Sequence, residues 1–283
     1  MPSRALIALS LLFTVFLWGG NNAGIKFLVG SWPPLWVGAT RFLCAGLLML
    51  AFVRGGASVA THRLWRGGLA LAVYIAVFNW AIALTAVSHV ALYLAASPVW
   101  ALAWEGREGR EKGEYTRRFS AAGLALFGVG VLLWPALQSG DRFSWTGECL
   151  GLASSFLWVA YGRQCRALGA TLSGAAVSAH TMWRAGVWLL PFGLLEIART
   201  PLVWESRLFW VQLYCIIFGG VVAFGLWNRA LRHWRTSEVY LFNNLIPVST
   251  MLWAYFCLDE PMASTFWLAV ACIAAGVALA QRS

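Results

Sequence analysis

The stretch FLWGGNNAGIK, Phe16–Lys26, decides how this chain is interpreted, because a related stretch, FLWVAYGRQCR, returns 140 positions later as Phe156–Arg166. In both copies an apolar run reaches a Phe-Leu-Trp triplet, passes into small or polar residues and closes on a cation. A second pair, SHVALYLAASPV at 88–99 and SEVYLFNNLIPV at 237–248, keeps Ser, Val, Leu, Pro and Val in register at a spacing of 149. Because both pairs occur in the same order in each half, the sequence predicts an internal duplication.

The composition indicates a membrane protein. The 283 residues are 60% hydrophobic and 11% charged, with mean hydropathy +0.69, whereas soluble domains carry about 25% charged residues. The apolar runs reach the roughly 17 to 25 residues with which a helix crosses a bilayer. The formal net charge is +10, but the cations form no dense basic stripe in a polar segment. We therefore assign them to cytoplasmic loops and expect no nucleic-acid partner.

We predict an all-α polytopic membrane protein with ten transmembrane helices, five in each half. The two repeats would comprise residues 1–140 and 141–283, the second inverted relative to the first, together forming one transport domain. The first apolar run lacks a convincing cleavage site, so we interpret it as a retained helix. The expected helices span about 5–25, 35–53, 67–87, 89–104, 119–136, 146–162, 174–195, 208–228, 237–257 and 264–281.

The distribution of cations predicts the orientation. With the amino terminus inside, fifteen of the 21 Lys and Arg residues fall in cytoplasmic segments and four outside, while Arg41 and Arg184 fall within spans. This bias predicts that both termini are cytoplasmic. An odd number of spans per half then inverts the second copy, and inverted repeats place a shared site near the midplane of the bilayer.

Motifs for other functions are absent from the sequence. The six Cys residues form no CxxC pair and fall mostly in apolar runs, so we expect neither a disulfide framework nor a metal site. The sequence contains no GxxxxGK[ST], HExxH or GxSxG motif. We therefore predict a protein that is not an enzyme, with no catalytic residues, no cofactor and no ATP-binding motif. The duplication also disfavours a non-transporting scaffold, because packing alone does not require it.

Polar and aromatic residues inside the expected spans are the candidates for a binding site, because a polar group in a span needs a partner or a purpose. Asn22 follows Trp18 by one helical turn, and Trp158 occupies the place of Trp18 in the second copy. Pro98 and Pro247 predict helix kinks beside aromatic and amide residues. Two alternatives stay open: the amides join packed helices, or the rings face lipid. The candidate cavity residues are Trp18, Asn22, Asn79, Tyr93, Trp100, Trp158, Tyr161, Trp227, Asn243 and Asn244.

Arg41 and Arg184 hold nearly equivalent positions in the two halves. Each would either bind a substrate carboxylate or hold helices together. We favour the structural interpretation, because both lie only a few residues into their spans and can reach an interface by snorkelling. The ionisable residues His89, His180 and Glu148 receive no coupling role.

The motifs resemble the EamA branch of the drug/metabolite transporter superfamily over essentially the whole chain. They are Leu17-Trp18-Gly19 followed by Asn21 and Lys26, the Arg41-Phe42 step, Ala83-Leu84 before Ser88, Pro98 and Pro247, and Glu260. The many Trp residues and the amino-terminal sequence are also similar to the YddG-type aromatic amino-acid exporters. This resemblance implies a cavity between the halves, with the fifth and tenth helices at the periphery. One departure is the charged segment WEGREGREKGE, 104–114, which predicts that the fourth helix extends into the cytoplasm on pairs of Glu and Arg.

The residues and the resemblance together predict a secondary transporter in the bacterial inner membrane. It would export amino acids, aromatic and other neutral ones, by alternating access through a central cavity, with lipid around it. The alternative substrate is a cationic aromatic drug or another small metabolite.

Overall fold

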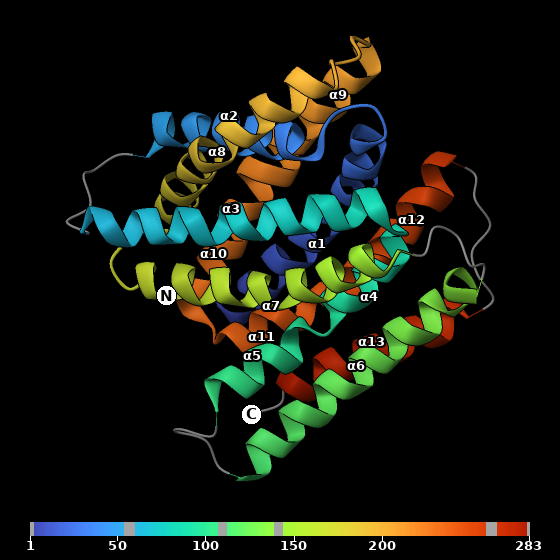
Figure 1. Cartoon of the computed structure of the whole chain (residues 1–283). Coiled ribbons are helices and arrows are strands. Elements are labelled where there is room, and N and C mark those ends of the chain that lie inside the picture. Colours follow the sequence, from blue (N-terminus) through green and yellow to red (C-terminus); the bar gives the residue numbers. More distant parts are fainter. Residues whose placement is uncertain (1–2, 54–59, 107–111, 139–143, 259–264, 282–283) are drawn as a thin grey trace.

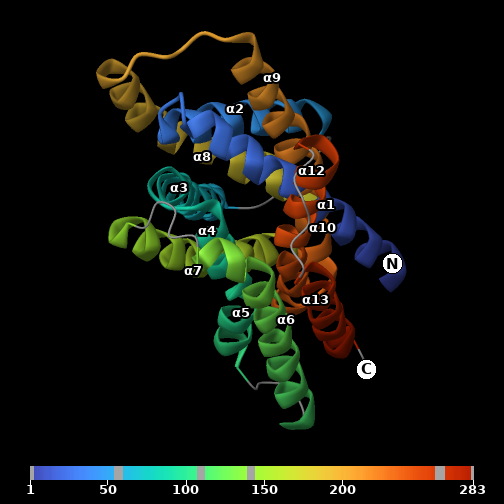
Figure 2. The ribbon, with the colours of Figure 1, turned by 90° about the vertical axis from the view of Figure 1, so that its right-hand side faces the viewer.

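The computed structural model describes residues 3–53, 60–106, 112–138, 144–258 and 265–281, and within these ranges every regular element is a helix (Figures 1 and 2). The first half contains α1 (Arg4–Val29), α2 (Pro34–Phe52), α3 (Thr61–Leu84), α4 (Val87–Ala95), α5 (Ser97–Glu105) and α6 (Lys112–Gln138). The second half contains α7 (Trp145–Leu168), α8 (Gly174–Arg199), α9 (Ser206–Tyr214), the π-helix η1 (Cys215–Val222), α10 (Ala223–His233), α11 (Thr236–Tyr240), the 3₁₀ helix η2 (Leu241–Leu245), α12 (Ile246–Leu258) and α13 (Phe266–Gln281).

Several of these elements follow one another without a loop. Helix α4 passes into α5 at Ala96, and Pro98 lies in the first turn of α5. Pro247 likewise lies in the first turn of α12, after η2. A proline fits the first turn of a helix because its missing N–H has no helical acceptor there. The predicted breaks at both prolines are therefore confirmed.

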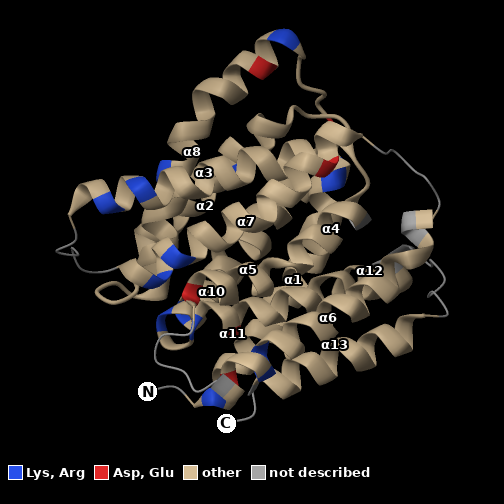
Figure 3. Cartoon of the chain, turned by 60° about the horizontal axis from the view of Figure 1, so that its bottom comes forward, with Lys and Arg blue, Asp and Glu red and all other residues tan. Residues whose placement is uncertain are grey.

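The outer surface is suited to lipid. Five helical stretches of the described chain are long and apolar enough to cross a membrane: Arg4–Val29, Pro34–Phe52, Thr61–Leu84, Gly113–Pro135 and Ser206–His233. Large apolar side chains point outward from several helices, among them Phe127, Phe192 and Trp267. Most charged residues lie toward helix ends and connecting segments (Figure 3). These observations support the predicted membrane protein of the all-α class.

The fourth helix does not continue into the charged segment as the sequence predicted, although residues 107–111 of that segment lie outside the described residues. Helix α5 ends at Glu105, and Gly106 adopts a φ of 66°, a left-handed conformation that glycine accepts without steric cost. The carboxylate of Glu105 accepts hydrogen bonds from the backbone N–H and the hydroxyl of Ser237, at 3.0 and 2.8 Å. This contact fixes the end of α5 against the start of α11.

Helices of the two halves pack closely against each other. Helix α2 lies along α8, α3 along α7, and α6 along α13, the last pair at the periphery (Figures 1 and 2). At the crossing of α2 and α8, a Cβ atom on Gly46 would collide with the backbone of Trp183, and one on Gly186 with the backbone of Leu43. Glycine at both positions permits this close approach of the two helices.

Candidate substrate cavity

A small cavity lies among helices of both halves. Its volume is about 40 Å³, which is room for two or three water molecules at roughly 15 Å³ each. Its walls come from α1 to α4 and from α7, α10, η2 and α12. The lining residues are Trp18, Asn21, Asn22, Arg41, Tyr74, Ile75, Phe78, Leu94, Trp158, Phe224, Asn243 and Ile246.

Trp158 is the centre of an aromatic cluster at this cavity. Its side chain is 4% exposed, and its backbone carbonyl accepts a hydrogen bond from the Tyr240 hydroxyl at 2.5 Å. Such ring contacts stabilise a packed cluster beyond the apolar area that they bury. The rings around Trp158 belong to Tyr74 at 4.9 Å between centroids, Trp18 at 5.5 Å, Tyr161 and Tyr240 at 5.6 Å, Trp227 at 5.7 Å and Phe224 at 5.9 Å.

The π-helix η1 positions the α1 side of the cavity. The indole N–H of Trp18 donates to the carbonyl of Gly219 at 3.0 Å. A Cβ atom on Gly219 would collide with the side chain of Asn21, so only glycine fits beneath this amide. The wide turns of a π-helix are frequent at functional sites because they displace backbone groups from regular helical bonding.

Arg41 faces the same cavity and does not reach an interface, so the snorkelling interpretation is wrong for this residue. Its side chain is 3% exposed, and Nη1 donates to Asn21 Oδ1 at 3.3 Å. The guanidinium carbon also lies 4.4 Å from the ring centroid of Phe42. Arg184 has a different environment: Nη1 donates to the His180 carbonyl at 3.0 Å, and the group stacks on Trp183. The two arginines are thus equivalent in sequence but not in surroundings.

Four of the ten predicted site residues line the cavity: Trp18, Asn22, Trp158 and Asn243. Tyr161 and Trp227 belong to the surrounding cluster and contact the ring of Trp158. The Tyr161 hydroxyl lies 3.1 Å from Thr181 Oγ1 and accepts from Asn228 Nδ2 at 3.4 Å, in a polar network behind the cluster. Asn244 is fully buried, and neither its amide oxygen nor its amide nitrogen has a hydrogen-bond partner within the described part of the chain.

The remaining three predicted residues point elsewhere. Asn79 Nδ2 donates to the carbonyl of Pro34 at 2.8 Å, where it joins α3 to the start of α2. The Tyr93 hydroxyl donates to Glu148 Oε2 at 2.7 Å, and Trp100 Nε1 donates to Ser155 Oγ at 3.1 Å. Tyr93 on α4 and Trp100 on α5 therefore contact α7 and do not line the cavity.

Sequence reasoning did not select several lining residues. Tyr74 and Phe78 on α3 stack at 5.6 Å between centroids, and Phe224 on α10 contacts Trp18 at 5.3 Å. The spacing of four between Tyr74 and Phe78 was a usable signal, since residues four apart share a helix face. Phe224 carries no comparable pattern.

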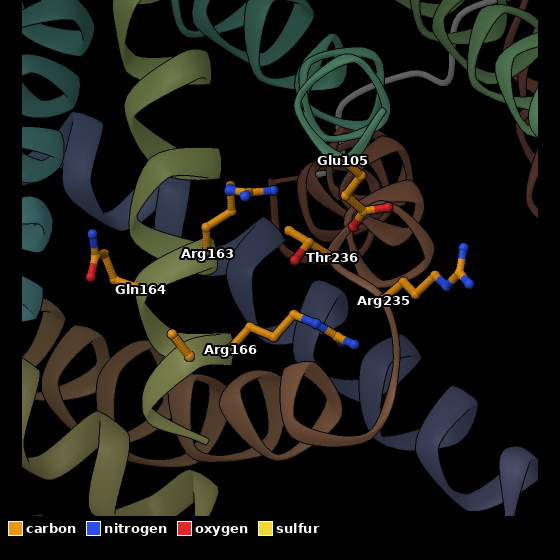
Figure 4. Close-up of a pocket in the computed structure, with 7 residues that line it drawn as sticks. Glu105, Arg163, Gln164, Arg166, Arg235 and Thr236 are labelled. Carbon is orange, nitrogen blue, oxygen red and sulfur yellow. The ribbon is translucent and has the colours of Figure 1, made fainter. Parts of the chain in front are cut away.

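A second, larger hollow of about 610 Å³, called the vestibule here, opens beside the end of α7 (Figure 4). Arg166 donates to the backbone carbonyls of Trp234 and Leu231. Arg163, five residues after Trp158 and so about 7.5 Å further along the helix, lies over the ring of Trp104. The vestibule is lined by Glu105, Arg163, Gln164, Arg166, Ala167, Arg235 and Thr236.

A membrane chain whose halves enclose a cavity in this way has the architecture of a membrane transporter. Residues 145–281 match the model of the EamA-like transporter family. This match confirms the predicted resemblance to that family, and the chain is a membrane transporter similar to its members.

Relatives match over nearly the full length of the chain. An uncharacterized inner membrane transporter of Escherichia coli strain K12, YedA, is 27% identical, with 99% of this chain and 92% of YedA covered. A probable amino-acid metabolite efflux pump of the same strain is 22% identical, with 94% and 91% covered. A solved crystal structure superposes on 99% of this chain and 97% of its own, with a TM-score of 0.80 at 20% identity. This last similarity concerns the fold.

Proposed function

We propose that this transporter exports amino acids, aromatic and other neutral ones, across the inner membrane by alternating access through the cavity. Its halves, residues 1–140 and 141–283, are inverted repeats of five spanning helices, and both termini are cytoplasmic. Inverted repeats allow such a site to open to one side at a time as the halves rock against each other.

The reciprocal packing of the helices supports the inverted arrangement. The described helices form ten continuous stretches when α4 is joined to α5, α9 to α10 and α11 to α12. The second stretches of the two halves, α2 and α8, pack together, as do the fifth, α6 and α13. The third stretch of the first half is α3, and it packs on α7, which is the first stretch of the second half. Conversely, the first stretch, α1, packs on the third stretch of the second half, from α9 to α10. A two-fold relation between halves produces this exchange of partners.

The single observation that carries the amino-acid assignment is the mixed wall of the cavity. The aromatic rings of Trp18 and Trp158 offer an apolar surface to a side chain, while the amides of Asn22 and Asn243 offer hydrogen bonds to a polar head group. Binding pockets for small molecules typically combine an apolar wall with a few polar groups. Two relatives, from Escherichia coli and Salmonella typhimurium, are described as probable amino-acid metabolite efflux pumps.

The size of the cavity indicates how access would alternate. At about 40 Å³ it is too small for an amino acid, so substrate entry requires the aromatic cluster to open. Tyr240 joins α11 to Trp158 on α7, between the cavity and the vestibule. We expect this contact to break when substrate enters from the cytoplasmic side.

A cationic aromatic substrate is less well matched to the cavity. None of the residues that line it in the described chain is acidic. A permanent cation would therefore meet no counter-charge there, and Arg41 would repel it.

Counterflow into liposomes tests the proposal. Purified protein with internal unlabelled tryptophan should accumulate external labelled tryptophan transiently, with threonine and methionine as further substrates. Replacing Trp158 by Ala should lower the initial rate at least tenfold, because substrate would lose its central aromatic contact, and replacing it by Phe, which keeps a smaller ring, should lower the rate less. The matched control is Trp267→Phe, since Trp267 is 73% exposed on the outer face of α13 and should transport normally.

Wild-type rates in both Trp158 variants would remove this residue from the site. Absence of exchange of all three amino acids by folded wild-type protein would overturn the amino-acid assignment, and exchange of a viologen in their place would establish the cationic alternative.

A further inference from the structure

Arg41 carries a buried positive charge that pairs with no acidic residue in the described part of the chain. It is the eighth residue of α2, about 10 Å along a helix of 19 residues. No carboxylate of the described residues lies within ion-pair distance of it, and its Nε has no hydrogen-bond partner among them. The hydrogen bond to Asn21 satisfies only part of the guanidinium group.

The Nε atoms of the two other buried arginines in the described chain also lack a hydrogen-bond partner, but the rest of their contacts differ from those of Arg41. Arg118 is 8% exposed and pairs with Glu238 at 2.9 Å and with Glu114 at 3.0 Å. Arg184 bonds a carbonyl of its own helix and lies between the rings of Trp183 and Trp65. A buried charge without a partner is strongly destabilising. Within the described chain the charge of Arg41 meets only the amide oxygen of Asn21 and the ring of Phe42, so much of the cost of its burial is not offset.

An amino acid carries a carboxylate, an ammonium group and a side chain, and the groups around Arg41 suit the last two. Across the cavity, the amide oxygen of Asn243 has no hydrogen-bond partner in the described chain, and the amide of Asn22 lies on the wall. These amides suit an ammonium group, and the rings of Trp18 and Trp158 suit an apolar side chain. The guanidinium fork can bind both oxygens of a carboxylate at once.

We propose that Arg41 binds the carboxylate of the transported molecule, so that the site selects substrates with a free carboxylate and rejects their amides and amines. This inference rests on the proposed amino-acid transport and adds the group that the site recognises. In the substrate-free cavity Asn21 holds the guanidinium in position, and the carboxylate would occupy its remaining donors.

The test compares tryptophan with tryptophanamide, which keeps the ring and the amine but lacks the carboxylate. As a competitor of labelled-tryptophan counterflow, the amide should require at least a tenfold higher concentration than tryptophan in the wild-type protein, as loss of a charge-assisted hydrogen bond predicts. In Arg41→Gln the rate should fall at least tenfold, and the preference for acid over amide should shrink to within about twofold of unity. Arg184→Gln, the matched buried arginine outside the cavity, should keep the wild-type preference.

Ligand-induced thermal stabilisation in detergent supplies a readout that needs no transport. Tryptophan should raise the melting temperature of the wild type and of Arg184→Gln, and should not raise that of Arg41→Gln. Equal competition by acid and amide in a wild type that exchanges tryptophan would overturn the role of Arg41 alone. An unchanged preference for tryptophan over tryptophanamide in Arg41→Gln would also overturn this role. If that variant fails to fold, the comparison of the two compounds in the wild-type protein still tests the proposal. Failure of the wild type to exchange any amino acid would instead overturn the proposed function.

Discussion

Glu148 in the first turn of α7 bonds three side chains, one from the segment that connects α3 to α4 and two from α4. Its carboxylate accepts from Thr85 Oγ1, from His89 Nδ1 at 2.8 Å and from the Tyr93 hydroxyl at 2.7 Å. The group is buried, so each lost bond leaves a donor without a partner. Hydrogen bonds to a charged group contribute about 1.5 to 3 kcal/mol each.

We expect Glu148→Gln to lower the free energy of unfolding by about 2 kcal/mol, because a neutral amide accepts these three donors less strongly and brings donors of its own. Tyr93→Phe removes one donor only and should cost about 1.5 kcal/mol. Thermal unfolding of the purified variants in detergent measures both. A melting temperature of Glu148→Gln equal to that of the wild type would contradict a stabilising role for this cluster.

For single residues, the sequence predicted the cavity lining correctly where the same residue type occurs at matching places of the two related stretches. Trp18 and Trp158 occupy matching places in the two copies, and both line the cavity. Tyr93 on α4 and Trp100 on α5 were also selected, but both side chains bond to residues of α7. Spacing identifies which residues share a face, whereas the neighbour of that face depends on packing between distant helices. The burial of Arg41 was missed for the same reason.

Among the elements, the crossing of α2 and α8 depends on two glycines. A side chain at Gly46 would displace the backbone of α8 at Trp183. We expect Gly46→Ala to destabilise the protein by about 1 to 3 kcal/mol through overpacking. The measurement is thermal unfolding together with the counterflow rate.

The matched control is Gly123→Ala on α6, where an added Cβ atom meets nothing within 4 Å. That substitution should leave transport unchanged and stabilise the helix by about 0.5 to 1 kcal/mol, because alanine loses less backbone entropy than glycine. Equal effects of the two substitutions would indicate that the close approach at Gly46 is unimportant.

The helical segments themselves were largely predictable, because long apolar runs and the two prolines mark them in the sequence. The irregular turns were not. The π-helix η1 depends on how Asn21 and Trp18 of α1 meet Gly219, a contact about 200 residues apart in the chain. The end of α5 at Glu105 likewise depends on Ser237. Local pattern carries no information on such distant partners.

For the whole molecule, reporter fusions test the inverted arrangement. A fluorescent protein that folds only in the cytoplasm should be bright after residue 283 and dark after residue 138. Alkaline phosphatase, which is active only outside, should give the reverse pattern, because five spans separate the first fusion site from the amino terminus. Phosphatase activity at the carboxyl terminus would contradict the proposed cytoplasmic ends.

Two whole-molecule properties were predicted from the sequence: the membrane class from the composition, and a duplication from the two pairs of related stretches. The packing of α2 on α8 and of α6 on α13 is the arrangement that such a duplication leads one to expect. The small volume of the cavity was not predictable, since it depends on how closely several aromatic rings approach one another.

That close approach has an electrical consequence. We expect the rings packed around Trp158 to block the passage of ions between the small cavity and the vestibule, because a bare ion cannot cross apolar rings without losing its hydration. We therefore expect planar bilayers containing the protein to show no measurable conductance at rest. A cell could then carry many copies of the protein without dissipating the ion gradients on which its other transport depends.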